Sequence, residues 1–182
     1  MNPNLLLFNA ARAGNVANFK RVLEENPELD INWQNPSHSN RTSLHMAAEN
    51  GHHEIVKILL AHPQIDVNSL NGEEGSTALS RACENGKVEV IRLLCEDPRV
   101  DVNLTANISG YVPLFKTIYW NKLQALKWLI ALRGEDLDMN KKAATNGGNW
   151  KTLLEIARDV DFPDITSLLE RFAANPPSTN PV

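Results

Sequence analysis

The chain has 182 residues, of which 42% are hydrophobic and 22% are charged, a composition that suits one folded domain or a short array of repeats. Its formal net charge of −4 provides no basic surface for a nucleic acid or an anionic membrane. The apolar runs are only a few residues long, and the N-terminus lacks the pattern of a secretory signal. We therefore expect a cytoplasmic protein, with the nucleus as the alternative location.

The sequence contains internal repeats at a regular spacing. Residues 42–68, TSLHMAAENGHHEIVKILLAHPQIDVN, align without a gap with residues 77–103, TALSRACENGKVEVIRLLCEDPRVDVN, at an offset of 35 residues. Looser copies precede and follow them, which predicts five units at about 4–40, 41–75, 76–110, 111–149 and 150–174. Such a period indicates a solenoid of stacked repeats. We expect one repeat domain over residues 1–174, followed by a disordered Pro-rich tail, NPPSTNPV, at 175–182.

Each unit reads as two short helices and a projecting connection. The first helix begins at a capping threonine, Thr42, Thr77 or Thr152, and ends at an Asn-Gly pair in units two and three. The second helix carries a broad apolar stripe, on which Trp128 aligns with Ile58 and Leu93 and is expected in the core. A proline, an extended Asp-Val-Asn segment and a loop or hairpin rich in turn residues follow.

At the N-terminus, four consecutive apolar residues, 5–8, have three interpretations: they cover the core of the first unit, mark a dimer contact, or mark a truncated chain. The covering role is the expectation we adopt.

This pattern resembles the ankyrin repeat family. TSLHMAAENGHHEIVKILL is similar to that family's T-P-L-H-x-A-A and G-H-x-E-I-V-K-x-L-L core, and the two DVN segments match its closing motif. The units here have 35 residues instead of about 33. The resemblance implies an all-α solenoid of helix-turn-helix units with hairpin connections. It also gives His45 and His52 structural roles and leaves His53 on the surface.

The resemblance implies a non-enzymatic module that binds another protein through its hairpin tips and a concave groove. Transferred position by position, this surface comprises Trp33, Arg41, Glu49, Asn50, Glu73, Glu74, Ser76, Glu84, Asn85, Tyr111, Tyr119, Trp120 and Lys151. The acidic residues of units two and three and the aromatic residues of unit four favour a partner with basic and apolar groups. Two alternatives stay open at Trp120, which either covers the following loop or binds the partner. Trp33 similarly either stabilises its hairpin or forms an exposed anchor.

Asn68 and Asn103 lie in segments similar to those that an intracellular asparagine hydroxylase modifies in ankyrin proteins. The competing interpretation is that each asparagine hydrogen-bonds to backbone within its own hairpin.

No enzymatic or metal-binding motif occurs in the sequence, and Cys83 and Cys95 lie in apolar helical patterns that predict buried, reduced thiols. We expect a monomer without cofactor, metal or catalytic residues. The alternative is a regulatory or targeting fragment of a larger enzyme or signalling protein.

Overall fold

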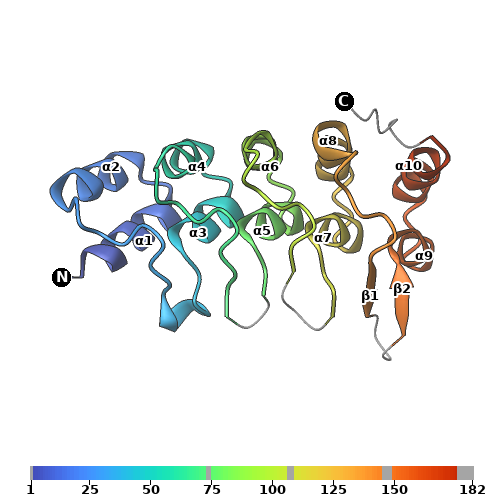
Figure 1. Ribbon diagram of the computed structural model, residues 1–182, viewed down its shortest axis with the longest axis horizontal. Helices are drawn as coiled ribbons and strands as arrows, with labels where there is room; N and C mark the ends of the chain where they lie inside the picture. Colours follow the sequence, from blue (N-terminus) through green and yellow to red (C-terminus); the bar gives the residue numbers. More distant parts are fainter. Residues whose placement is uncertain (1, 73–74, 106–108, 145–148, 176–182) are drawn as a thin grey trace.

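The computed structural model describes residues 2–72, 75–105, 109–144 and 149–175. In these residues the helices form five consecutive pairs, and the first helix of each pair lies in an inner layer while the second lies in an outer layer (Figure 1). The inner layer contains α1 (Pro3–Ala13), α3 (Ser43–Asn50), α5 (Ala78–Glu84), α7 (Pro113–Tyr119) and α9 (Leu153–Asp159). The outer layer contains α2 (Val16–Glu25), α4 (His53–Leu60), α6 (Val88–Glu96), α8 (Leu123–Arg133) and α10 (Pro163–Ala174).

The inner helices begin and end where the sequence predicts. The side chains of Thr42, Thr77 and Thr152 each accept a hydrogen bond from the backbone N–H three residues later, which caps α3, α5 and α9. Gly51 closes α3 with a φ of 83°, a left-handed conformation that costs glycine little. Local sequence therefore sets the length of these helices.

Neighbouring units share one continuous core. Ala47 and Ala48 of α3 and Ala82 and Cys83 of α5 have no exposed surface, so small side chains allow the inner helices to lie close together. Ile55, Val56 and Leu59 of α4 recur as Val90, Ile91 and Leu94 of α6, all fully buried. No single pair could bury these faces alone, because each face is covered partly by the next unit.

Trp128 corrects an expectation of the alignment. Its side chain is 36% exposed on α8, and the Arg92 guanidinium lies 4.7 Å from its ring centre. The aligned residues Ile58 and Leu93 are also only partly buried. This position therefore lies at the edge of the apolar stripe, where an indole can pack beneath a cation and remain partly exposed to water.

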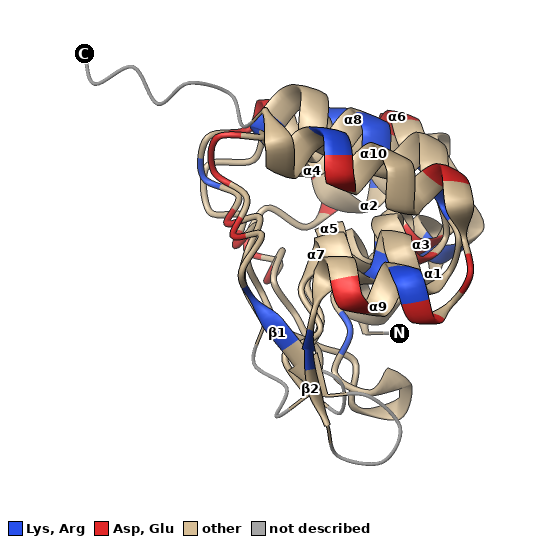
Figure 2. Cartoon of the chain, turned by 90° about the vertical axis from the view of Figure 1, so that its right-hand side faces the viewer, with Lys and Arg blue, Asp and Glu red and all other residues tan. Residues whose placement is uncertain are grey.

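The connections project beyond the inner layer, as the end-on view shows (Figure 2). The only paired strands among the described residues are β1 (Lys142–Ala144) and β2 (Trp150–Thr152), which are antiparallel with Lys142 opposite Thr152. A 3₁₀ helix (Pro36–His38) occupies the first connection. The Asp-Val-Asn segments were expected to be extended, but they are turns: the Asp66 carboxylate accepts a hydrogen bond from the Asn68 N–H at 3.0 Å.

At the N-terminal end, Leu7 and Phe8 are buried and cover the first unit, as expected. The Phe8 ring meets Trp33 edge to face at 6.2 Å between ring centres. Most of the predicted disordered tail, residues 176–182, lies outside the described residues.

Candidate functional site

The predicted binding residues of the second unit form an ion pair. The Arg41 guanidinium, just before α3, lies 2.9 Å from the Glu49 carboxylate at the end of that helix. Both side chains are largely covered, with 21% and 27% of their surface exposed. Asn50 is exposed next to them, and its amide donates to the Met46 carbonyl at 2.9 Å. Because the charges of Arg41 and Glu49 offset each other, this part of the surface is not strongly acidic.

In the third unit, Glu84 lies between two cations. Its carboxylate is 3.3 Å from the Arg81 guanidinium and 3.4 Å from the Lys116 ammonium of the next unit. Arg81 and Lys116 are buried, whereas the neighbouring Asn85 is exposed. This cluster links α5 to α7 electrostatically, so Glu84 belongs to the joint between two units as well as to their surface.

Aromatic rings follow one side of α7. Phe115 stacks on Tyr111 with ring centres 4.3 Å apart and planes within 4°, and on Tyr119 at 5.6 Å. Trp120 meets Tyr119 edge to face at 5.6 Å. The spacing of four residues places Phe115 and Tyr119 on the same face of α7, and Tyr111, two residues before the helix begins, continues the stack beyond its N-terminus. We call these four residues the aromatic row.

Tyr119 and Trp120 are the water-facing end of the aromatic row, at 45% and 48% exposure. Tyr111 is partly buried, and its hydroxyl donates to the Ala144 carbonyl of β1 at 2.9 Å. The aromatic row therefore extends from Tyr111, which is hydrogen-bonded to the hairpin, to Trp120, which is exposed to solvent at the end of α7.

A pocket of about 250 Å³ opens beside the aromatic row, between α7 and α9. Tyr111, Phe115 and Tyr119 form one wall, and Ile156 and Val160 contribute to the other. At its rim Lys151 of β2 forms an ion pair with Asp159 of α9. An aromatic and aliphatic lining with a few polar groups at the edge is the usual character of a protein recognition pocket.

Ser76 was expected on the binding surface, but its side chain is only 1% exposed. Its carbonyl accepts a hydrogen bond from His45 Nε2 at 2.9 Å, across the boundary between units two and three. His45 Nδ1 lies 3.2 Å from the Thr42 backbone nitrogen and accepts its proton. Ser76 therefore holds two units together and is not available to a partner.

Trp33 lies apart from the pocket, and two further predicted positions lie outside the described residues. Trp33 is partly buried against Phe8 at the other end of the array, which favours its role in stabilising the first connection. Glu73 and Glu74 lie outside the described residues. The structure thus brings together Tyr111, Tyr119, Trp120 and Lys151. Arg41, Glu49, Asn50, Glu84 and Asn85 lie at the ends of the inner helices α3 and α5.

Asn68 and Asn103 join neighbouring units, not the two sides of one hairpin. The Asn68 amide donates to the Arg99 carbonyl at 2.8 Å, and its oxygen accepts from the Asp101 N–H at 2.9 Å. Asn103 makes the same two bonds to Asp136 and Asp138, at 2.6 and 3.0 Å. Modification of these two asparagines stays a prediction.

The comparison with known families agrees with this architecture. A sequence model described as ankyrin repeats (3 copies) matches residues 7–106 and again residues 64–143, which together exceed half of the chain. The chain belongs to the ankyrin repeat family. The predicted all-α ankyrin solenoid is thereby confirmed. No curated protein matches the sequence.

Within this ankyrin array, sequence reasoning missed the central member of the aromatic row. Phe115 aligns with His45, and Val112 replaces the capping Thr42, so α7 has no side-chain cap. The signal was present as an aromatic residue four positions from both Tyr111 and Tyr119. Lys116 was missed because its partner, Glu84, lies in a different repeat.

Titratable groups of the ankyrin core are shifted by burial. Desolvation lowers the pKa of His45 from 6.5 to about 4, and the nearby positive charges of Arg81 and Arg41 act in the same direction. Burial raises the pKa of Cys95 to about 12 and that of Cys83 well above its usual value. Both thiols are free and buried, as expected.

Among the described residues, no group of three or more His, Cys, Asp or Glu side chains could hold a metal ion. No described helix has the length and hydrophobicity needed to cross a membrane.

Proposed function

We propose that the chain is a non-enzymatic interaction module that binds another protein along the groove between its inner helices and hairpins. Ankyrin repeats are generally protein–protein interaction modules. The observation that carries the assignment to this groove is the aromatic row, which ends in an exposed Tyr119 and Trp120 beside an apolar pocket. Tyrosine and tryptophan dominate the binding energy of many protein interfaces.

The proposed partner inserts an apolar or aromatic side chain into the pocket between α7 and α9. The earlier expectation of a basic partner loses its main support, because Glu49 is paired with Arg41 and Glu84 with Arg81 and Lys116. The Lys151–Asp159 pair at the rim can instead hydrogen-bond to the backbone or polar side chains of the bound segment. The remaining predicted contacts, Asn50 and Asn85, are exposed along the same groove.

The free, buried thiols support our proposal that the module acts as a monomer in the reducing cytoplasm. A regulatory fragment of a larger protein would use the same groove, and therefore differs from the main proposal only in what else the natural polypeptide contains.

The test compares two tryptophan substitutions. A partner is first captured with the native chain and purified, and its affinity is then measured by calorimetry for Trp120→Ala and for Trp128→Ala. Trp128 is the matched control because it is also partly exposed but lies on the outer layer. We expect Trp120→Ala to weaken binding by roughly 30-fold, about 2 kcal/mol, and Trp128→Ala to leave it unchanged. Equal effects of the two substitutions would refute the groove assignment.

A further inference from the structure

One hydrogen-bonding arrangement is repeated at three successive boundaries of the array. Asn32 donates its amide proton to the Gln64 carbonyl at 2.7 Å and accepts from the Asp66 N–H at 2.8 Å. Asn68 and Asn103 make the same pair of bonds to the units that follow them. In each case the asparagine carboxamide donates to the backbone carbonyl of one residue and accepts from the N–H of an aspartate. That aspartate lies two residues after the residue that supplies the carbonyl.

The first unit has a backbone carbonyl and an aspartate N–H at the positions that, in later units, bond to the asparagine of the preceding unit. Its turn has the same local structure as the later turns, because the Leu29 N–H donates to the Asn26 carbonyl and the Asp30 carboxylate accepts from the Asn32 N–H. By alignment, the Glu28 carbonyl and the Asp30 N–H take the places of the Gln64 carbonyl and the Asp66 N–H. Within the described residues, neither of these two groups makes a hydrogen bond.

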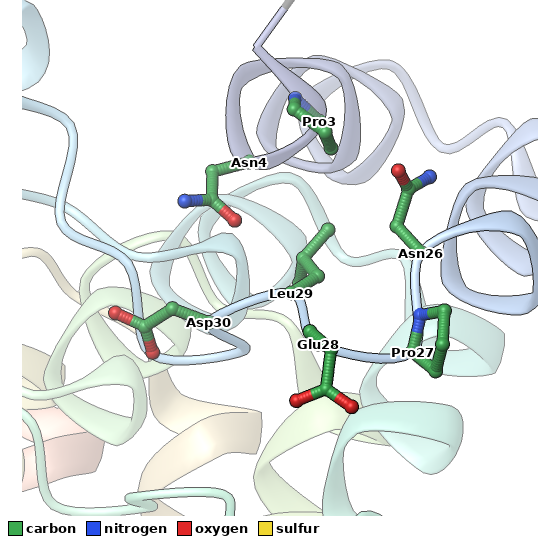
Figure 3. A pocket seen from close by; sticks show the side chains of 7 residues that line it. All are labelled: Pro3, Asn4, Asn26, Pro27, Glu28, Leu29 and Asp30. Carbon is green, nitrogen blue, oxygen red and sulfur yellow. The ribbon is translucent and has the colours of Figure 1, made fainter.

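A pocket of about 370 Å³ lies at this position. Pro3 and Asn4 of α1 lie across from the turn that carries Pro27, Glu28 and Leu29, as the close view shows (Figure 3). Glu28 and Asp30, the residues that carry the backbone acceptor and the backbone donor, are thus among those that line a partly apolar pocket.

We propose that this pocket is a second binding site, which takes the asparagine side chain of a partner protein's turn. The chain itself demonstrates the recognition three times, with the same backbone groups and the same ligand chemistry. The site lies at the opposite end of the array from the aromatic row and is independent of the function proposed for that groove.

The chemistry of the pocket selects a primary carboxamide. The ligand must donate to the Glu28 carbonyl and accept from the Asp30 N–H through neighbouring atoms, which an asparagine amide does. A carboxylate has no proton to donate, and an ammonium group has no lone pair to accept with. Glu28 and Asp30 are both acidic residues of the pocket lining, and their negative charges disfavour an anionic ligand.

The experiment uses the full chain, labelled with ¹⁵N, and two short capped peptides. One peptide has the sequence of residues 65–70, IDVNSL, and the other replaces its asparagine by aspartate, IDVDSL. NMR follows the amide signal of Asp30 during each titration. The amides of Asp66, Asp101 and Asp138 serve as internal references, because internal asparagines already occupy them.

We expect IDVNSL to shift the Asp30 amide in a saturable manner at roughly millimolar concentration. IDVDSL should bind at least about tenfold more weakly, since it leaves the Glu28 carbonyl unsatisfied. An Asp30 signal that does not move, or that moves equally with both peptides, would overturn the proposal.

Two variants locate the effect. Asp30→Pro removes the backbone donor and should abolish the shift of its neighbours, whereas Asp30→Asn keeps both the donor and an oxygen for the Asn32 N–H and should retain binding. The unchanged reference amides report that each variant is folded. Retention of binding by a folded Asp30→Pro protein would also contradict the proposed site.

Discussion

His45 connects two repeats through one buried imidazole ring. Its Nδ1 accepts from the Thr42 N–H and its Nε2 donates to the Ser76 carbonyl, so the neutral ring carries its proton on Nε2. Protonation of Nδ1 would remove that acceptor and place a charge near Arg81 and Arg41 in a desolvated site. The ring therefore favours the folded state only while it is neutral.

This arrangement predicts a loss of stability in mild acid. Because the folded-state pKa of about 4 lies below the ordinary value of 6.5, the unfolded chain binds the proton more tightly between these values. The contribution of His45 is complete above pH 6.5 and is lost as the pH falls to about 4, a change of roughly 3 kcal/mol. Urea unfolding at several pH values measures it.

The control for this prediction is a pair of histidine substitutions. His45→Gln should flatten the pH dependence in that range, while His53→Ala, at an exposed position, should leave it as in the native chain. An unchanged slope in His45→Gln would show that other groups cause the acid sensitivity.

The asparagine bonds between repeats give a second prediction. Asn68→Ala removes two hydrogen bonds to the next repeat and should lower the free energy of unfolding by about 1–2 kcal/mol. Asn140 ends the same turn in the fourth repeat, but its carboxamide makes no hydrogen bond in the described part of the chain. Asn140→Ala should therefore be nearly neutral, and chemical denaturation of both variants checks the difference. Similar losses in the two proteins would mean that the bonds contribute little.

Helix α7 differs from the other inner helices in how it is stabilised. It lacks the threonine cap of α3, α5 and α9, and it buries Phe115 between Tyr111 and Tyr119 instead. Aromatic stacking between neighbouring turns thus replaces a polar cap. The replacement of the cap by stacked rings leaves an aromatic surface next to α9, and this is the surface that we propose binds the partner.

Phe115→Ala tests the structural role of this stack. Phe115 is 3% exposed, so truncation should lower the free energy of unfolding by roughly 3–5 kcal/mol. Tyr119→Ala, at a 45% exposed position, should cost less than about 1 kcal/mol. Thermal and urea unfolding give both values, and a small loss for Phe115→Ala would contradict the packed arrangement of the aromatic row.

Local features of the helices could be predicted from the sequence, whereas the specific partners of contacts between repeats could not. Thr42 and Gly51 act within a few residues of their positions, so the start and end of α3 follow from the sequence. The family resemblance implied that His45 bonds to a neighbouring repeat, but the identity of its acceptor, the Ser76 carbonyl, and the burial of Ser76 required the structure. Trp128 was placed in the core because alignment equates positions without measuring how far the apolar stripe extends.

The same distinction applies to the candidate site. Tyr111, Tyr119 and Trp120 were predicted from their unusual place in the repeat, yet their arrangement as a row required Phe115, which aligns with a histidine. The charges of Glu49 and Glu84 suggested an acidic surface, and their pairing with nearby cations became visible only in three dimensions.

Over the whole molecule, different surfaces of each ankyrin repeat form the core and the proposed binding sites. Shared faces between repeats bury the continuous core, and the inner helices and the projecting connections lie along one side of the array (Figures 1 and 2). The exposed end of the aromatic row and its pocket lie at α7 and α9, near the C-terminal end of the array. The asparagine-binding pocket lies at the N-terminal end, so the two proposed sites can be occupied independently.

Hydrogen exchange of the full chain, with and without its purified partner, tests the groove assignment most directly. We predict that partner binding slows amide exchange in residues 111–120 and 150–159, which form α7, β2 and α9, while exchange in the outer helices α4, α6 and α8 stays unchanged. Protection of those outer helices, with no change at α7 and α9, would contradict the account.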